Sequence, residues 1–397
     1  MASQAAACPG PRNFGRHPLT PLADEQSALR DMTRAFVRKE IAPFAAEWDR
    51  TETVPLDTVR KLGALGLNGV CIPPEWGGAG ADFVAYVLAT EELAYGDAGV
   101  CNMINAANAF AMTVDDHGTP AQKAGFLRPV ASGRMHACLL LTEPQAGSDL
   151  ANLRTRAVRR GEGWVLNGGK CFITSGGSAG VGVALAVTDP DAGKRGISAF
   201  LLRTDQPGYT VVRKERKLGH RTNDTCQIAF EDLVLPADSL LGRPGEGLKI
   251  ALSSMEGTRI GAAAQSVGVA RAALDAALAY ARERETFGQK LIEHQAVAFK
   301  LADMATEIEV ARQMCLHAAG LKAARAPALK QASMAKLFAA QMCERVCSEA
   351  IQIHGGYGFV NDFPVEKYYR DARVFQIYDG TNEVQKILIA RELAAGR

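Results

Sequence analysis

One carboxylate, Asp379, stands out as a group that could perform acid–base chemistry. It lies in the stretch RDARVFQIYDGTNE (370–383), between Tyr378 and the pair Gly380-Thr381. An aromatic residue on one side and small residues on the other are typical of an acid presented from a loop or a helix start. Apolar surroundings raise the pKa of an acid toward neutrality, which suits a general base. The other interpretation is that Asp379 caps a helix beginning near Thr381, and the stretch is compatible with both.

Two further stretches carry groups suited to anions or carbonyl oxygens. In LLLTEPQAGSD (139–149), Gly147 and Ser148 belong to a turn whose backbone N–H groups and hydroxyl are free to bind a phosphate or a carbonyl oxygen. The alternative is that this turn only connects two elements of the fold and binds nothing. In RERETFGQKLIEHQ (282–295), Arg284 lies where a long helix should end. An arginine there is either a solvated cap or, through its planar fork, a partner for a diphosphate.

The composition excludes several classes of protein. A chain of 397 residues with 47% apolar and 22% charged residues should form two or three packed regions of ordinary globular character. The formal net charge of +2 gives no reason to expect nucleic acid or a membrane surface as a partner. The nine cysteines form no CxxC pair and no zinc-like cluster with histidine, so we expect no metal site and a reducing compartment. Residues 1–20 are expected to be a disordered leader.

Hydrophobic periodicity divides the rest of the chain into three parts. Residues 21–135 follow helical spacing, residues 136–246 change to short alternating or β-branched segments, and residues 247–397 return to long helices. The expected strands are 183–188, 197–203, 209–214 and 227–235. The expected long helices are 260–285, 296–324, 328–353 and one from 381. The predicted fold class is α+β, with an N-terminal helical domain, a middle antiparallel β-domain and a C-terminal four-helix bundle.

Four stretches in this order resemble the acyl-CoA dehydrogenase family of flavoproteins. They are LLLTEPQAGSD, KCFITSGG (170–177), RERETFGQKLIEHQ and IQIHGGYGFVNDFPVEKYYRDARVFQIYDGT (351–381), and the resemblance covers roughly residues 22–395. It implies the family's fold and an FAD cofactor. It also implies an oxidoreductase acting on the CH–CH group of an acyl-CoA in fatty acid β-oxidation, of the short- or medium-chain or branched-chain type.

The resemblance also implies which residues bind FAD. Phe172 would cover the isoalloxazine ring, where many relatives have tryptophan, and Thr174 would hydrogen-bond at N5. Without the family, Phe172 is one more core aromatic residue of a strand. The other implied residues on the flavin side are Leu141, Thr142, Gly147, Ser148, Thr381 and Glu383. Those implied for the ADP part of a neighbouring subunit's FAD are Arg284, Thr286, Phe287, Gln352, Gly355 and Gly356. The two glycines are alternatively a helix C-cap.

The substrate side is implied in the same way. The expected contacts to the acyl-CoA are Ser148, Asn102, Asn105, Glu256, Arg259, Tyr378, Gly380 and Arg391. The stretch NMINAANAF (102–110) would form the floor of the acyl pocket. Its asparagines favour a short or somewhat polar tail, and its lack of an arginine argues against a glutaryl-type substrate.

In the implied reaction, Asp379 takes the α-proton of the thioester, the β-hydrogen leaves as hydride to flavin N5, and trans-2-enoyl-CoA forms. The backbone N–H of Asp379 would also serve the developing enolate oxygen. Most relatives have glutamate here, and the shorter aspartate withdraws the carboxylate by about 1.5 Å. A misplacement of that size lowers a rate by about a hundredfold unless the pocket compensates.

Three explanations of this aspartate stay open. The substrate could sit closer, as an α-branched or cyclic acyl group requires; the protein could be a slow dehydrogenase; or its chemistry could differ. Nitroalkane oxidase, a member of the superfamily, uses aspartate here, but the arginine that assists it seven positions later is Lys386 in this chain. The base of some branched-chain relatives falls at Thr258 and is therefore absent, which leaves Glu256 as an outside candidate.

The remaining implications concern partners and place. An FAD site completed by a neighbouring subunit implies a homotetramer built as a dimer of dimers. The electron acceptor would be an electron-transfer flavoprotein, with no nucleic acid or membrane as partner. The compartment would be the cytoplasm of a bacterium or the mitochondrial matrix of a eukaryote. The alternatives are an oxidase or lyase of divergent chemistry and a non-catalytic FAD-binding protein.

Overall fold

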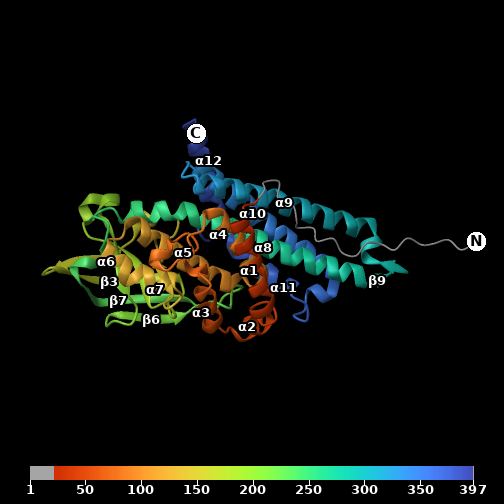
Figure 1. Ribbon diagram of the computed structural model, residues 1–397, viewed down its shortest axis with the longest axis horizontal. Coiled ribbons are helices and arrows are strands. Elements are labelled where there is room, and N and C mark those ends of the chain that lie inside the picture. Colours follow the sequence, from red (N-terminus) through yellow and green to blue (C-terminus); the bar gives the residue numbers. More distant parts are fainter. Residues whose placement is uncertain (1–21, 397) are drawn as a thin grey trace, which may run out of the picture.

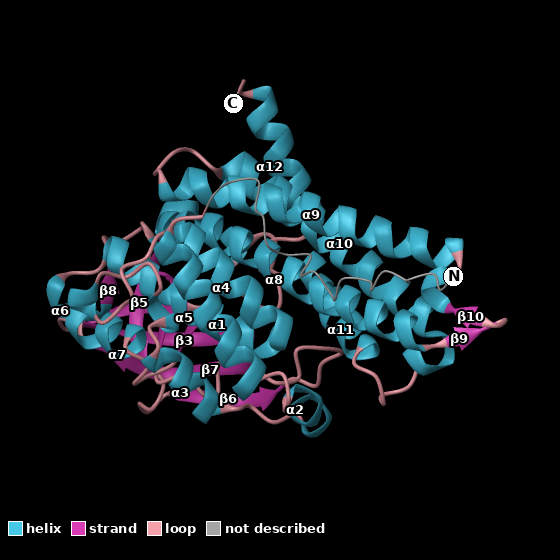
Figure 2. Ribbon diagram, turned by 45° about the vertical axis from the view of Figure 1, so that its right-hand side comes forward, coloured by secondary structure: helices cyan, strands magenta, loops and turns pink. Residues whose placement is uncertain are grey.

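The computed structural model of the chain describes residues 22–396, and the leader expected at 1–20 lies outside them. Two helical regions flank a β-domain in the chain, so the predicted α+β class and the order of the three regions are confirmed (Figure 1). The sheet lies at one end of the molecule, and the long C-terminal helices run from it toward the small hairpin β9–β10 at the other end (Figure 2). No helix within residues 22–396 is long and apolar enough to cross a membrane.

The N-terminal region is helical throughout. Its helices are α1 (Asp24–Glu40), α2 (Ala45–Thr51), α3 (Leu56–Ala64), α4 (Phe83–Gly96), α5 (Ala98–His117), α6 (Pro120–Gln122) and α7 (Arg128–Ala131). Asp82 and Asp97 are the N-cap residues of α4 and α5, because their carboxylates accept the backbone N–H groups of Ala85 and Val100. Both helices are largely buried, so α4 and α5 form the inner layer of this region.

The middle region is a predominantly antiparallel sheet. Its strands are β1 (Ala137–Leu140), β2 (Arg156–Arg160), β3 (Gly163–Thr174), β4 (Val181–Val187), β5 (Ile197–Arg203), β6 (Tyr209–Lys214), β7 (Thr225–Leu235) and β8 (Leu240–Leu241). The order is β6-β7-β3-β2-β4-β5-β8, with β1 beside β4. The pairs β1–β4 and β2–β4 are parallel, which departs from the purely antiparallel prediction. The expected strands match β4 to β7, and the strand expected around Phe172 is the end of β3, whereas β1, β2 and β8 were not predicted as strands.

The C-terminal region contains the long helices α8 (Gly247–Glu283), α9 (Gln295–Ala323) and α10 (Leu329–His354), followed by α11 (Val365–Ala372) and α12 (Asn382–Ala394). Between α8 and α9 lies the hairpin of β9 (Glu285–Thr286) and β10 (Gln289–Lys290). Helix α8 begins at Gly247, so the predicted start at residue 260 was wrong. Glycines along α8 interrupt the helical pattern in the sequence, but their lack of a side chain lets α8 approach α4, as at Gly268, where a Cβ would lie 2.3 Å from the Glu91 carbonyl oxygen.

The helical regions share one core, and the sheet has two. Buried side chains of α4 and α5, such as Leu88 and Ile104, pack in one cluster with Ile260 of α8 and Val346 of α10. The sheet contributes to two further clusters, one packed against α5 and α7 and one formed by side chains of β1 to β5 and β7 themselves. The three sequence regions are therefore joined through continuous packing, which fixes α5, α8 and the C-terminal loops relative to the sheet.

Candidate active site

Asp379 lies in a turn rather than at a helix cap. Helix α12 begins at Asn382, and its N-cap is Thr381, whose Oγ1 accepts the N–H of Val384 at 3.4 Å. Asp379 and Gly380 both have left-handed backbone conformations, with φ of 52° and 88°. Asp379 therefore has no role as the cap of α12, and its half-buried carboxylate is presented from the turn.

The surroundings of Asp379 favour a basic carboxylate. Burial raises the pKa of Asp379 above its ordinary value, and Lys336, a hydrogen bond from Thr258 and Arg259 oppose the rise. None of the ion pairs within 4 Å among residues 22–396 includes Asp379, so its carboxylate is not neutralised by direct contact. A raised pKa is the arrangement expected of a carboxylate that takes up a proton during a reaction.

The segment 170–177 presents an aromatic ring from an otherwise buried strand. Phe172 is 65% exposed, while Cys171 and Ile173 on either side are buried. The pairing of β3 with β7 shifts register between Lys170 and Ile173, and Phe172 has a φ of 57°. A bulge of this kind turns a side chain outward. The sheet thus offers one flat aromatic face beside the half-buried Thr174.

A buried ion pair holds the neighbouring turn 141–148 against this strand. Lys170 Nζ lies 2.8 Å from Glu143 Oε1 and 3.1 Å from the Leu141 carbonyl oxygen. Glu143 also accepts the backbone N–H groups of Arg154 at 2.6 Å and Thr155 at 3.0 Å. Burial alone would raise the pKa of Glu143, but Lys170 and the hydrogen bonds outweigh it and lower the pKa to about 2. The pair thereby fixes the predicted residues Leu141 and Thr142, and leaves Gly147 and Ser148 exposed.

Helix α5 brings the predicted asparagines to this strand. Asn102 Nδ2 donates to Thr174 Oγ1 at 3.3 Å. One turn further, Asn105 Oδ1 accepts from Tyr86 Oη at 3.1 Å and Thr90 Oγ1 at 3.2 Å. Both asparagines are half-buried on a mostly buried helix, and the face that they share is the predicted floor of the acyl pocket.

Three contributors to this pocket were not predicted. Gln265 of α8 is fully buried and accepts a hydrogen bond from Tyr378 Oη, while its Nε2 has no partner among the described residues. Tyr86 of α4 bonds Asn105, and Lys336 of α10 is fully buried behind the turn of Asp379. A signal for Lys336 does exist in the sequence, because a lysine falls on the alanine-rich, core-facing side of α10.

The other predicted substrate contacts, Arg259, Glu256 and Arg391, differ in burial and in their partners. Arg259 is buried on α8, and its Nε has no hydrogen-bond partner in residues 22–396. Glu256 pairs with Lys322 of α9 at 3.4 Å, so it is engaged elsewhere. Arg391 is exposed in the last turn of α12, which projects from the rest of the molecule (Figure 2).

The residues predicted for the ADP part lie at the opposite end of the molecule. Arg284 follows Arg259 by about 25 residues along α8, roughly 40 Å at about 1.5 Å per residue. Phe287 in the β9–β10 hairpin is 99% exposed. Exposed in the same part of the fold are Arg284, Gln352, Gly355 and Gly356, with Thr286 half-buried. This group cannot serve the same bound molecule as Phe172 within one chain.

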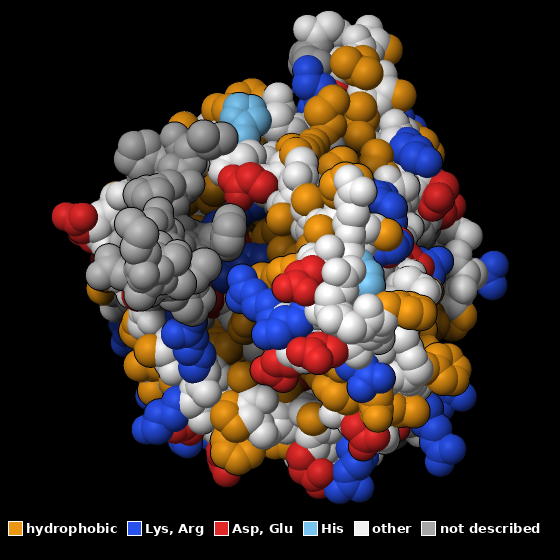
Figure 3. Space-filling model, turned by 90° about the vertical axis from the view of Figure 1, so that its right-hand side faces the viewer, with side chains coloured by type: hydrophobic (Ala, Val, Ile, Leu, Met, Phe, Trp, Pro, Cys, Tyr) orange, Lys and Arg blue, Asp and Glu red, His pale blue; other side chains and the backbone are white. Residues whose placement is uncertain are grey.

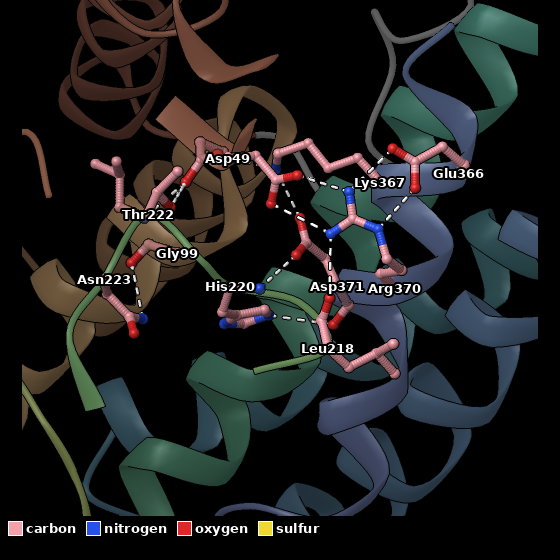
Figure 4. A network of polar contacts seen from close by, with 12 residues as sticks. Asp49, Gly99, Leu218, His220, Thr222, Asn223, Glu366, Lys367, Arg370 and Asp371 are labelled. Atoms are coloured by element: carbon pink, nitrogen blue, oxygen red, sulfur yellow. Dashed lines mark hydrogen bonds and ion pairs between the residues drawn. The ribbon is translucent and has the colours of Figure 1, made fainter. Parts of the chain in front are cut away.

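A polar network joins all three regions beside the segment that leads to Asp379 (Figure 4). Lys367 of α11 pairs with Asp97 at 2.9 Å and Asp371 at 2.7 Å, and Asp97 also accepts the Thr222 hydroxyl. Asp371 in turn accepts the backbone N–H of His220. Every one of these side chains is buried, so the network holds its geometry tightly.

The same network adjoins Arg370, which pairs with Asp49 of α2 and with Glu366 (Figure 4). Asp371 leads directly into the loop of Asp379, and residues 220–224 lead into Thr225, the partner of Thr174 in the β3–β7 register. The network therefore fixes the turn of Asp379 relative to the strand of Phe172.

Comparison with known proteins shows the family. Domain profiles of the acyl-CoA dehydrogenase family match residues 23–134 (N-terminal domain), 138–233 (middle domain) and 245–394 (C-terminal domain). The chain belongs to the acyl-CoA dehydrogenase family and is an oxidoreductase that uses FAD.

Among its relatives is the short-chain-specific acyl-CoA dehydrogenase of Clostridium acetobutylicum, 41% identical over 94% of this chain and 98% of the relative. Butyryl-CoA dehydrogenase from Megasphaera elsdenii has the same fold, with a TM-score of 0.93 and 39% identity over 94% of this chain and 99% of that chain. A chain solved in work on the electron-transferring flavoprotein of Acidaminococcus fermentans also has a TM-score of 0.93, with 42% identity over 94% and 98% of the two chains.

The described residues fit FAD. The outward ring of Phe172 offers a face for the isoalloxazine, and the turn exposing Gly147 and Ser148 lies beside it in the fold. The buried Arg259 Nε without a partner is a free donor near Asp379. Within residues 22–396, no group of histidine, cysteine and acidic side chains could hold a metal ion.

Proposed function

We propose that this protein dehydrogenates a short acyl-CoA thioester to the trans-2-enoyl-CoA, with Asp379 as the base that takes the α-proton. When bound, FAD accepts the β-hydride. The observation that carries the proposal is the half-buried carboxylate of Asp379, whose pKa is raised by burial and which has no direct cationic contact among the described residues. The charge of Asp379 acts on Tyr86, the hydrogen-bond partner of Asn105, so the carboxylate lies near the face of α5 that would border the acyl pocket.

The polar floor of that pocket supports a short acyl chain. The pairs Asn105–Tyr86 and Gln265–Tyr378 border it, and Tyr378 directly precedes the base. A long tail would have to displace these hydrogen-bonded side chains and leave them unpaired, at about 1–3 kcal/mol for each buried group. The names of the butyryl-CoA and short-chain-specific relatives point the same way.

The same reasoning assigns the flavin-side contacts. Phe172 would cover the isoalloxazine, Thr174 would bond at N5, and Leu141, Thr142 and Ser148 would line the cofactor, with Thr381 and Glu383 at the start of α12. On the substrate side, Arg259, Tyr378 and Gly380 adjoin Asp379, while Glu256 and Arg391 would reach only the CoA portion. The proposed compartments remain the bacterial cytoplasm or the mitochondrial matrix.

The remote group of residues supports a second copy of this chain as the source of the ADP contacts. Figure 3 looks onto the end of the molecule that carries the β9–β10 hairpin, where hydrophobic side chains lie open among charged ones. Phe287 is 99% and Phe359 86% exposed. Such apolar side chains are buried in an assembly, and a dimer of dimers would place Arg284, Thr286 and Gln352 on the partner's FAD. Phe287→Glu should therefore lower both the assembly state in light scattering and the FAD content.

A panel of four thioesters and one nitroalkane tests the reaction. Butyryl-CoA, isobutyryl-CoA, cyclohexanoyl-CoA, octanoyl-CoA and nitroethane are each mixed anaerobically with the FAD-loaded enzyme, and bleaching of the flavin is followed. We expect butyryl-CoA or isobutyryl-CoA to bleach it fastest, and Asp379→Asn to lower that rate by about 10²–10⁴-fold with FAD still bound. Bleaching by nitroethane alone would instead assign nitroalkane chemistry. Full activity of Asp379→Asn would move the base elsewhere, with Glu256 as the next candidate.

The electron acceptor is proposed from the same comparison. The chain solved in work on an electron-transferring flavoprotein has this fold. We therefore expect a purified electron-transfer flavoprotein to reoxidise the bleached enzyme faster than dioxygen does.

A further inference from the structure

Lys336 is a fully buried lysine that the reaction described so far does not use. It lies on α10, and its Nζ donates to the Gly380 carbonyl oxygen at 2.8 Å. Among residues 22–396 no carboxylate lies within 4 Å of its ammonium. Burying an ammonium costs several kcal/mol unless it is compensated, so its place behind the turn of Asp379 calls for an explanation.

The turn of Asp379 is one that needs outside support. A non-glycine residue in the left-handed region costs about 1–2 kcal/mol, and such a residue persists only where its neighbours over-determine it. Here the supports are two side chains. Lys336 and Gln385 both reach the Gly380 carbonyl at 2.8 Å, and Gln385 also bonds the Asp379 carbonyl at 3.1 Å. Both carbonyls are thereby held on the side of α10 and α12.

Lys336 is also the leading charged neighbour of the base. Of the groups that stabilise the ionised carboxylate of Asp379, Lys336 contributes most, ahead of Thr258 and Arg259. In return, burial lowers the pKa of Lys336 to about 8, and Asp379 opposes that shift. The other titratable groups facing this turn are Arg259 of α8, Tyr86 of α4, Cys101 of α5, His220 of the middle region, Tyr378, and Glu383 of α12.

We propose that Lys336 is a positioning residue for the reaction: its ammonium holds the Gly380 carbonyl, and with it the left-handed turn that presents Asp379, while its positive charge lies beside the carboxylate without touching it. The proposal rests on Asp379 being the base. Gln385 supplies the second, neutral half of the same support.

Two variants separate the charge from the hydrogen bond. Lys336→Met keeps the length and removes both, whereas Lys336→Gln keeps an N–H donor and removes the charge. Lys217→Met is the matched control, because the pKa of Lys217 is likewise lowered to about 8 by burial, but its Nζ bonds Asn223 and Thr225 rather than the turn. All are measured as FAD-loaded enzyme with butyryl-CoA as the probe.

The readouts are the limiting rate of anaerobic flavin bleaching from pH 5.5 to 9 and the exchange of the α-proton of butyryl-CoA into D₂O, followed by NMR. Asp379 must be ionised to act, so the rates rise with pH. Loss of the Lys336 charge should move that rise to higher pH in both variants. At neutral pH we expect Lys336→Met to be slower by about 10- to 100-fold, Lys336→Gln to recover part of this loss, and Lys217→Met to keep the wild-type profile.

A Lys336→Met enzyme with wild-type rates and profile would overturn the proposal, as would equal losses in both variants with an unmoved profile, since that result indicates packing alone. If Lys336→Met does not fold, the profile of Lys336→Gln decides. Failure of the base assignment looks different, because Asp379→Asn would then stay active. If only the role of Lys336 is wrong, Asp379→Asn is inactive and Lys336→Met resembles the wild type.

Discussion

Two buried lysines lie behind the two loops of the candidate site, and they are held in different ways. Lys170 makes an ion pair with Glu143 at 2.8 Å behind the flavin-side turn. Among residues 22–396, Lys336 bonds a carbonyl oxygen behind the turn of Asp379 and has no carboxylate in contact. Burial lowers the pKa of both ammonium groups to about 8. The lysines are alike, and the difference lies in the carboxylate that each one faces.

The comparison shows what separates the structural acid Glu143 from Asp379, the proposed base. Glu143 accepts hydrogen bonds from Lys170, Gln145 and two backbone N–H groups, and its pKa falls to about 2. These hydrogen bonds stabilise the ionised carboxylate, so Glu143 is a poor proton acceptor. Asp379 has one hydroxyl and a cation beyond contact, so burial dominates and its pKa rises. The number of donors in contact decides the role, rather than burial.

The largest expected effect comes from breaking the Lys170–Glu143 ion pair. Lys170→Met leaves the Glu143 carboxylate buried without its ammonium, which should lower the free energy of unfolding by about 3–5 kcal/mol. Because the pair holds the turn of Leu141 and Thr142, FAD content should fall as well. Urea unfolding followed by tryptophan fluorescence, together with the flavin-to-protein absorbance ratio, measures both.

Lys336→Met serves as the counterpart of this variant. Lys336→Met should lose less stability than Lys170→Met, because it leaves no carboxylate without a contacting partner. Its rate of flavin bleaching, measured per bound flavin, should fall more than that of Lys170→Met. If the two variants showed the same ratio of stability loss to rate loss, the distinction between the two lysines would be wrong.

The second-largest expected effect is the acid sensitivity of the Lys170–Glu143 ion pair. A folded-state pKa of about 2 for Glu143, against an ordinary value of 4.5, contributes about 3 kcal/mol above pH 4.5. This contribution is lost as the pH falls from about 4.5 toward 2, since protonation then favours the unfolded chain. Unfolding free energies at pH 7, 4 and 3 measure it. Glu143→Gln should flatten the dependence, and an unchanged slope in that variant would assign the acid loss to other groups.

Much of the fold followed from the sequence, because its signals are local. The strands 197–203 and 209–214 were placed correctly, since alternation and turn residues mark them. Strand β3 was predicted only around Phe172 and not over its full length, because its glycines and its bulge at Phe172 interrupt the alternation. The start of α8 was misplaced for a related reason, since glycines needed for close packing weaken the helical signal.

The residues of the candidate site also divide into those that the sequence predicted and those that it did not. Asp379, Asn102 and Thr174 were singled out by motif, and the structure brings Asn102 and Thr174 into contact. Lys336 and Gln265 were not, because their roles depend on which residues of α8, α10 and the 378–381 turn meet in space. A buried lysine on an alanine-rich face is visible in the sequence, but its partner is a backbone carbonyl, which no side-chain pattern reports.

The smallest expected effect concerns the Thr258 hydroxyl beside Asp379, the proposed base. Thr258 Oγ1 lies 3.2 Å from the Met255 carbonyl and also bonds the Asp379 carboxylate. A hydroxyl has one proton, so it serves Asp379 when that group is ionised and Met255 when it is protonated. Thr258→Val should therefore raise the pKa of Asp379 and slow bleaching by less than about tenfold at pH 6.5, from the roughly 1 kcal/mol of one hydrogen bond. At pH 8.5 the rate should approach that of the wild type.

Thr258→Ser is the matched control, because it keeps the hydroxyl and loses only a methyl group. Its bleaching profile should coincide with that of the wild type. A Thr258→Val profile shifted to lower pH would mean that the hydroxyl favours the protonated acid. In that case Asp379 would owe its ionised form to Lys336 and Arg259 alone, and the contrast with Glu143 would rest on charge at a distance rather than on the number of donors in contact.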